Sequence, residues 1–392
     1  MLSLLGLARK SLSRVAIAIT ALTVAACEPV STTGAGGPAI DTNAAVPVAL
    51  LVPSGSGQAS DELLARSLQN AARLAIADLG NVKVDLRVYN TSGQPAQAAA
   101  MASKAVDEGA KIILGPVYAQ EANAAGAAVA SRGVNVLSFS NNGDIAGGNV
   151  FVLGPTFQNT ADRLSRYAVR QGTTRIMVVH DNTTAGEAGK TAIQRGVQRA
   201  GGSVVATSGY EFSQNGIVAA VPGIAETARS SNAQAMFMTA DTAGALPMIT
   251  QLLRDNNVSP EVTRFIGLTR WDIPAATLAL PGVQGGWFAL PDPGLYSQYQ
   301  ARYQTAYGEA PHPISGLAYD GVAAIGALVK QGQSDALTGR RLTQGSGFVG
   351  VNGIFRLLGD GTNERGLAVA QIRNNQVAVI DPAPRSFGGA GF

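Results

Sequence analysis

The stretch VPVALLVPSGSGQASDELLARSLQNAARLAIADLG, residues 46–80, decides which fold the sequence predicts. It begins with an apolar run, VPVALLV, which predicts a buried strand. A loop of small residues, PSGSG, follows this strand. Apolar residues then recur at helical spacing and predict a helix of about 19 residues, with Leu64, Leu68, Ala71, Ala75 and Leu79 on one face. A strand, a short loop and a helix in this order are typical of a parallel α/β sheet.

The same alternation continues along the chain and restarts near residue 174. KVDLRVYN, AKIILGP and VNVLSFS predict further strands in the first half, and TRIMVVHD, SVVATSGY, AQAMFMTA and RFIGLT do so in the second. Strands that are apolar throughout and separated by helices favour parallel sheets covered on both faces. We therefore expect an α/β protein of two doubly wound parallel-sheet lobes. A last segment, residues 350–380, predicts two strands around an Asp360-Gly361 turn.

The N-terminus resembles a secretory leader. Arg9, Lys10 and Arg14 precede an apolar run of about 12 residues, which is too short to span a bilayer of about 30 Å. The segment LTVAAC also resembles a lipobox, and Cys27, the single cysteine, stands where the lipid would be attached. The alternatives are an ordinary secretory signal with a chance cysteine and a buried apolar cysteine. With a lipid on Cys27, the chain is held on a membrane through its N-terminus alone.

The charge of the chain excludes one class of partner. Of the 29 Lys and Arg residues, three lie in the leader, and removing them leaves 26 basic residues against 26 acidic ones. A basic patch with interleaved aromatic residues is also missing from the sequence, and we therefore expect no nucleic-acid partner. The residues after the leader are too many for one ordinary core, which again favours two domains.

The opening loop partly resembles a dinucleotide-binding loop. Gly55 and Gly57 match the first two glycines of that motif, but Ser60 occupies the third glycine position. Asp61 and Glu62, in the first turn of the helix, would repel a phosphate. We expect instead that Ser60 caps the helix and that the loop either contacts a small polar ligand or is a tight turn.

Catalytic machinery is hard to assemble from this sequence. The two histidines, His180 and His312, stand in no metal-ligand spacing, and a nucleophile elbow is missing. His180 ends a strand, where a structural histidine is the more ordinary interpretation. A carboxylate pair such as Asp241 with Asp272 could meet in space. We predict no enzyme, no catalytic residue, no metal site and no cofactor.

The arrangement resembles the type I periplasmic binding proteins of the leucine/isoleucine/valine-binding family. The carriers are VALLVPSGSG, the segment from VYNTSGQPAQ through EGAKIILGPVYAQEA to VNVLSFS, and RIMVVHDNTTAGEAGKTAIQRGVQRAGGSVV. The resemblance implies two lobes joined by a hinge, a ligand between them, and no catalysis. It divides the chain into lobe I, residues 46–156 plus 292–345, and lobe II, residues 157–291 plus 346–380. The residues themselves predict a signal peptide over 1–26, a flexible tether rich in Pro, Gly, Ser and Thr over 27–45, and an irregular tail over 381–392.

By position, the resemblance implies a set of ligand-binding residues at the ends of the strands. They are Ser54, Gly55, Ser56, Gly57, Tyr118, Ser140, Asn141, Asn142, Thr184, Asp241, Thr269, Trp271 and Asp272. The chain departs from the amino-acid binders of this family at several of these places. Ala119 and Asn142 stand where a Ser and a Thr would hold a carboxylate, and Thr269 stands where an acidic residue would meet an ammonium group. Asp241 or Asp272 could take that role.

A second resemblance is to penicillin-binding protein activators, which are outer-membrane lipoproteins that stimulate a peptidoglycan synthase. It rests on the lipobox, on GFVGVNGIFRLLGDGTNERGLAVAQI and on APRSF. The long N-terminal helical-repeat domain of the larger activators is missing here. Two functions therefore stay open: capture of a small polar solute, such as an amino acid or a cell-wall-derived compound, with an ABC permease as partner; or activation of a peptidoglycan synthase. In both, we expect a periplasm-facing lipoprotein, with the outer membrane favoured.

Overall fold

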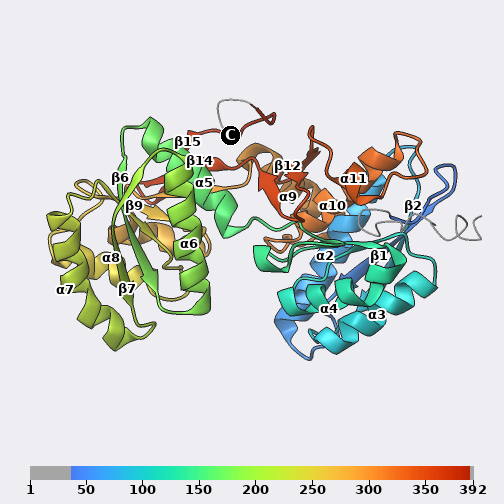
Figure 1. The fold of residues 1–392 in the computed structure, drawn as a ribbon, viewed down its shortest axis with the longest axis horizontal. Helices are drawn as coiled ribbons and strands as arrows, with labels where there is room; N and C mark the ends of the chain where they lie inside the picture. The colour runs from blue at the N-terminus through green and yellow to red at the C-terminus, as the bar shows by residue number, and fades with distance from the viewer. Residues whose placement is uncertain (1–36, 389–392) are drawn as a thin grey trace, which may run out of the picture. The chain divides into compact units, whose positions relative to one another are not determined.

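The computed structural model describes residues 37–388. Two larger sheets, each covered by helices, account for most of these residues (Figure 1). The lipidation prediction at Cys27 lies outside the described residues. The predicted fold class, two α/β lobes, is confirmed.

The first sheet has five parallel strands in the order β2-β1-β3-β4-β5. Their bounds are β1 (Val46–Val52), β2 (Val84–Asn90), β3 (Ile112–Leu114), β4 (Asn135–Ser138) and β5 (Val150–Val152). The helices of this lobe are α2 (Ala59–Ala77), α3 (Pro95–Asp107), α4 (Ala119–Val129), α9 (Pro293–Tyr307), α10 (Gly316–Val329) and α11 (Gly339–Leu342), with short turns η1 (Ala130–Arg132) and η2 (Gly143–Ile145). The predicted helix after the first strand is confirmed.

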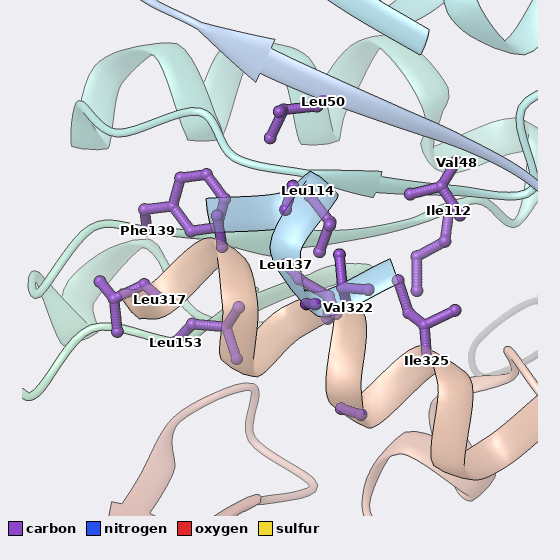
Figure 2. Packing of buried hydrophobic residues seen from close by; sticks show 14 of the residues in the cluster. Val48, Leu50, Ile112, Leu114, Leu137, Phe139, Leu153, Leu317, Val322 and Ile325 are labelled. Carbon is purple, nitrogen blue, oxygen red and sulfur yellow. The ribbon is translucent and has the colours of Figure 1, made fainter. Parts of the chain in front are cut away.

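Side chains alternate between the two faces of this sheet, and each face has its own core. Leu50 packs in a cluster with α2, α9 and α10, whereas Leu51 packs in a cluster with α3 and α4. Figure 2 shows Val322 and Ile325 of α10 among the side chains of the strands. The tyrosines of α9 tie that helix to α2: the hydroxyl of Tyr303 lies 3.2 Å from that of Ser67.

The second sheet has seven strands in the order β15-β14-β10-β9-β8-β6-β7. Their bounds are β6 (Arg175–Asp181), β7 (Ser203–Tyr210), β8 (Ala235–Met238), β9 (Arg264–Gly267), β10 (Trp287–Leu290), β14 (Ala368–Arg373) and β15 (Gln376–Asp381). Strands β6 to β10 are parallel, whereas β14 and β15 join antiparallel. The helices are α5 (Phe157–Arg170), α6 (Thr184–Arg199), α7 (Gln214–Ser230) and α8 (Leu246–Asp255), with turns η3 (Ala275–Ala279) and η4 (Pro281–Val283).

A small antiparallel sheet completes the fold. It contains β11 (Phe348–Gly350), β12 (Gly353–Leu357) and β13 (Asn363–Arg365). Strands β12 and β13 flank the predicted turn at Asp360-Gly361. The β14–β15 hairpin was not expected from the sequence. Its turn residues, Asn374 and Asn375, both have positive φ angles of 51° and 61°, a conformation that asparagine tolerates well.

Two segments pack differently from the prediction. Residues 346–380 were expected in lobe II, but Phe348 and Phe355 pack in the apolar cluster of the first sheet. Only the later part of the segment, with Leu367 and Val369, packs in a cluster of the second sheet. The expected flexible tether also ends earlier than residue 45. Ile40 is buried in the first cluster, and its N–H donates to the carbonyl of Ser334 at 2.9 Å. The other boundaries stay predictions.

A buried ion pair holds the third sheet to the first lobe. Asp320 of α10 accepts from the amide of Val351 at 2.8 Å and from the side chain of Asn352 at 3.0 Å. Arg365 of β13 donates to Asp320 at 3.0 Å and to the carbonyl of Leu153 at 2.7 Å. The Asp320 and Arg365 side chains are 0% and 2% exposed, so each charge depends on its partner inside the protein.

Candidate functional site

The loop after β1 is built around a carboxylate that the sequence analysis had considered only as a repulsive charge. The hydroxyl of Ser54 donates to Glu62 Oε2, and the amide of Gly55 donates to Glu62 Oε1, both at 2.6 Å. The hydrogen bond from Ser54, and to a smaller extent the one from Gly55, lowers the pKa of Glu62. Gly55 and Gly57 have φ angles of 90° and 79°, which glycine adopts without strain.

The start of α2 differs from the prediction. The helix begins at Ala59, and Gln58 rather than Ser60 precedes its first residue. The hydroxyl of Ser56 accepts from the amide of Gln58 at 3.1 Å. The Ser56 hydrogen bond is local to the loop. Gln58 makes no side-chain cap hydrogen bond, and Ser60, the expected cap, lies inside the helix. Ser54 and Ser56 are both partly exposed at this edge of the sheet.

The loops after β2 and β3 meet the first turn of α2. Tyr118, which precedes α4, donates its hydroxyl to Asp61 at 2.5 Å. Burial, followed by this bond to Asp61, raises the pKa of Tyr118 to about 12. A Cβ on Gly93 would lie 3.7 Å from Asp61 Oδ2 and 3.8 Å from the Tyr118 ring. The carboxyl ends of β1, β2 and β3 thus bring these side chains together, as expected for neighbouring parallel strands.

The predicted residues after β4 shape their own loop. The hydroxyl of Ser140 accepts from the amide of Asn142 at 3.1 Å, and Oδ1 of Asn142 accepts from the amide of Asp144 at 2.9 Å. Ser140 is buried, whereas Asn141 and Asn142 are exposed. Of these three residues, Asn141 and Asn142 present side chains to the solvent.

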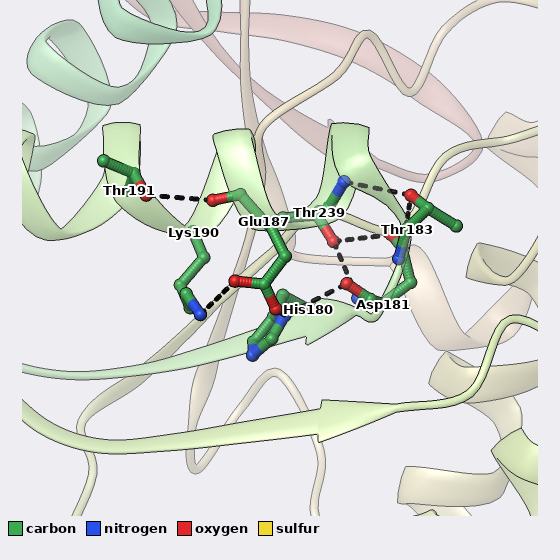
Figure 3. A network of polar contacts seen from close by, with 8 residues as sticks. His180, Asp181, Thr183, Glu187, Lys190, Thr191 and Thr239 are labelled. Carbon is green, nitrogen blue, oxygen red and sulfur yellow. Dashed lines mark hydrogen bonds and ion pairs between the residues drawn. The ribbon is translucent and has the colours of Figure 1, made fainter.

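The corresponding loop of the second lobe is organised by Asp181, at the end of β6. Its Oδ1 accepts the amide of Thr183 at 3.1 Å and its Oδ2 accepts the hydroxyl of Thr239 at 2.9 Å (Figure 3). Thr183 in turn caps α6 by accepting from the amide of Gly186 at 3.1 Å. Thr184, the predicted ligand contact, is the exposed first residue of that helix.

His180 belongs to the same network and has a structural role. Its ring is buried, with Nδ1 3.0 Å from the carbonyl of Asp181 and 3.3 Å from Oε1 of Glu187. Glu187 also pairs with Lys190 (Figure 3). These contacts link the end of β6 to α6.

The remaining second-lobe residues follow β8 and β9. Asp241 is exposed, and Thr242 donates to the carbonyl of Ile273 at 2.6 Å. Thr269 is half-buried and its hydroxyl has no partner among the described residues. Asp272 is engaged by Arg270, whose Nε lies 2.7 Å from Asp272 Oδ1. Asp272 is therefore already paired with a cation, whereas the Asp241 carboxylate is exposed.

Trp271 was predicted to contact the ligand, but its position in the structure does not suit that role. Its ring is fully buried in the core of the second lobe. A Cβ on Gly267 would lie 2.3 Å from the ring, and one on Gly286 would lie 2.4 Å from it. These two glycines make room for the indole, so Trp271 is a packing residue of the core and does not belong to the candidate site.

The sequence analysis missed several contributors to the two sheet edges. Glu62 was noted for its charge alone, and Asp181, Thr239 and Glu121 were not selected. The signal for Glu62 and Glu121 was an acidic residue in the first turn of a helix that follows a strand. Such residues are also common at ordinary helix starts, so the signal is weak.

Residues 37–388 contain neither a metal-ligand cluster nor a membrane-spanning helix. In that range, no group of three or more His, Cys, Asp or Glu residues could hold a metal ion. None of the helices in the same range is long and apolar enough to cross a membrane.

Comparisons with known proteins agree with the fold. A family model described as "Periplasmic binding protein" matches residues 45–376. No curated protein matches the sequence significantly. Among solved structures, a Rhodospirillum rubrum protein, provisionally assigned as a branched-chain amino acid ABC transporter, is similar with a TM-score of 0.74. It is 20% identical, and the alignment covers 86% of this chain and 100% of that one.

Two structures with bound molecules are also similar. One is an ABC transporter substrate-binding protein from Desulfitobacterium hafniense in complex with Leu, with a TM-score of 0.65, 16% identity and coverage of 86% of this chain and 100% of that one. The other is a solute-binding protein of an ABC transporter from R. palustris in complex with benzoate. Its TM-score is 0.58 at 16% identity, with coverage of 89% and 99%. At these identities, the likeness concerns the fold.

Proposed function

Because the chain belongs to the periplasmic binding protein family, we propose that it is a non-enzymatic, periplasmic solute-binding protein that captures a small polar solute between its two lobes. The observation that carries this proposal is the matched construction of the two sheet edges. In each lobe, polar residues lead from the first strand into a helix: Ser54–Gly57 precede α2, and Asn182 and Thr183 precede α6. Helix N-termini and exposed hydroxyls at such an edge suit a polar ligand.

The partners of this function follow from the relatives. The similar proteins with bound Leu and benzoate are components of ABC transporters, and an ABC permease would receive the solute from this chain. A lipid on Cys27 would hold the protein on the periplasmic side of a membrane, with the outer membrane favoured by Glu28 after the cysteine. Mass spectrometry of the native N-terminal peptide, compared with the Cys27→Ser variant, tests the anchor.

A thermal-shift screen of the full chain in detergent tests solute capture. A ligand that binds the folded state raises Tm by mass action, and we expect at least one member of a panel of amino acids, amines, aromatic acids and muropeptides to do so. Thr184→Ala, at the exposed start of α6, is expected to weaken that binding. Thr227→Ala, near the end of α7, is the matched control and should leave it unchanged.

The second candidate is activation of a peptidoglycan synthase by contact. One observation favours it: Glu62 already engages Ser54 and Gly55, two of the predicted ligand donors. No thermal shift with any solute, together with capture of a synthase by the full chain and stimulation of that synthase, would support this role and overturn solute capture.

A further inference from the structure

In the first lobe, the hydrogen-bond donors of the loop after β1 are already occupied by a carboxylate of the chain itself. Glu62 binds the hydroxyl of Ser54 with one oxygen and the amide of Gly55 with the other, each at 2.6 Å. A ligand carboxylate at this loop would compete with Glu62 for these donors and would meet its negative charge. The loop that the family resemblance assigns to a ligand is therefore satisfied by the chain itself.

A second carboxylate at this edge, that of Asp61, forms a hydrogen bond with a neutral side chain. Asp61 is 8% exposed and accepts the hydroxyl of Tyr118 at 2.5 Å. With its pKa raised to about 12, the Tyr118 phenol keeps its proton, so the partner of Asp61 is a neutral donor and not a cation.

Glu121, on the first turn of α4, is a buried carboxyl group whose oxygens have no clear hydrogen-bond partner in the described part of the chain. Its side chain is 1% exposed, yet neither carboxylate oxygen makes a hydrogen bond of good geometry within residues 37–388. The nearby hydroxyl of Thr91 donates to the carbonyl of Val52 at 3.1 Å. Burial outweighs the polar groups around the carboxyl, which are Thr91 and the amides of Tyr118 and Gln94, and raises the pKa of Glu121.

Glu121 borders a hollow of about 390 Å³ at the same edge of the sheet. The hollow is lined by Gly93, Pro95, Tyr118, Ala119, Gln120 and Glu121. None of these six residues carries a positive charge. A buried carboxylate that borders a hollow, has no ion-pair partner among the described residues and is close to the second carboxylate of Asp61 favours a cation. The Tyr118 ring adds an aromatic face that a cation can contact.

We propose that this hollow binds the cationic ammonium group of the captured solute, with Glu121 as its ion-pair partner and Tyr118 and Asp61 beside it. The inference rests on the proposed solute-binding function and names its ligand class: amines and basic solutes rather than simple carboxylic acids. Glu62 disfavours acids at the loop after β1, because it already occupies the donors of Ser54 and Gly55.

Matched pairs of probes test this ligand class. Isothermal titration of the full chain in detergent compares benzylamine with benzoate and isoamylamine with isovalerate, and putrescine serves as a dication. We expect the amines to bind and their acids to bind at least tenfold more weakly. Glu121→Gln should weaken amine binding at least tenfold, whereas Glu226→Gln, on the surface of α7, should leave it unchanged.

A measurement without ligand checks the state of Glu121. Because Gln removes a buried unpaired charge at nearly constant volume, the urea midpoint of Glu121→Gln should equal or exceed that of the unaltered chain. A lower midpoint would show that the carboxylate is a satisfied structural group and would overturn the assignment. A folded Glu121→Gln that binds amines normally would overturn it as well.

The outcomes separate this inference from the proposed function. Binding of acids or neutral solutes without binding of amines would retain solute capture and reject the cation site. Failure of every solute to bind would reject both. Amine binding that Glu121→Gln abolishes and Glu226→Gln preserves would support both.

Discussion

The buried Asp320–Arg365 pair gives the sharpest prediction about stability. Replacing Arg365 with Met removes the 3.0 Å ion pair and the 2.7 Å bond to the carbonyl of Leu153. It also removes the stacking of the guanidinium on Phe355, 4.9 Å from the ring centroid. Asp320 is then left as a fully buried carboxylate.

The expected loss follows from these contacts. Removing one partner of a buried ion pair costs about 3–5 kcal/mol, because the other charge stays buried without compensation. Asp320 keeps the amide of Val351 and the side-chain amide of Asn352 as donors, and we therefore expect a loss near the lower end, about 3 kcal/mol. Urea unfolding followed by far-UV circular dichroism measures it.

Three further variants complete this experiment. Arg340→Met removes a surface pair with Asp335, in which the Arg340 side chain is 73% exposed, and should cost less than about 1 kcal/mol. Asp320→Asn should be destabilising alone. Combined with Arg365→Met, it should cost less than the sum of the two single losses, since no unpaired charge remains. If Arg365→Met costs no more than Arg340→Met, the argument from burial is wrong.

Three other outcomes are expected. Burial lowers the pKa of His312, so the unfolded chain takes up its proton first as the pH falls below about 6.5. His312 therefore lowers stability as the pH falls. The urea midpoint of His312→Gln should change less between pH 7 and pH 5 than that of the unaltered chain, and an equal pH dependence of the two midpoints would contradict this. Gly267→Ala places a methyl group 2.3 Å from the Trp271 ring and should cost about 1–3 kcal/mol, with a shift in tryptophan fluorescence; unchanged stability would refute the tight contact. Thr239→Val removes the 2.9 Å hydroxyl bond to buried Asp181 and should cost about 1–3 kcal/mol by thermal unfolding, and a smaller loss would mean that water replaces it.

Local patterns were sufficient to predict most of the elements. The strand β1 and the helix α2 follow from the apolar run and the helical spacing within residues 46–80, because both signals depend on neighbours in the chain. The β14–β15 hairpin was missed because Asn374-Asn375 is a weaker turn signal than Asp360-Gly361. The packing of Phe348 with the first sheet depends on contacts far apart in sequence, which a local pattern does not contain.

The sequence by itself determined the class of fold, because the periodicity of apolar residues specifies which surfaces must be buried. It also placed polar loops at the ends of the strands, where parallel sheets bring them together. The tertiary structure alone decided which groups in those loops already have partners. Trp271 is in the core, Glu62 engages Ser54 and Gly55, and Glu121 is buried without an ion-pair partner among residues 37–388. Burial and hydrogen bonding depend on residues distant in the chain, and these contacts form only when the lobe has folded.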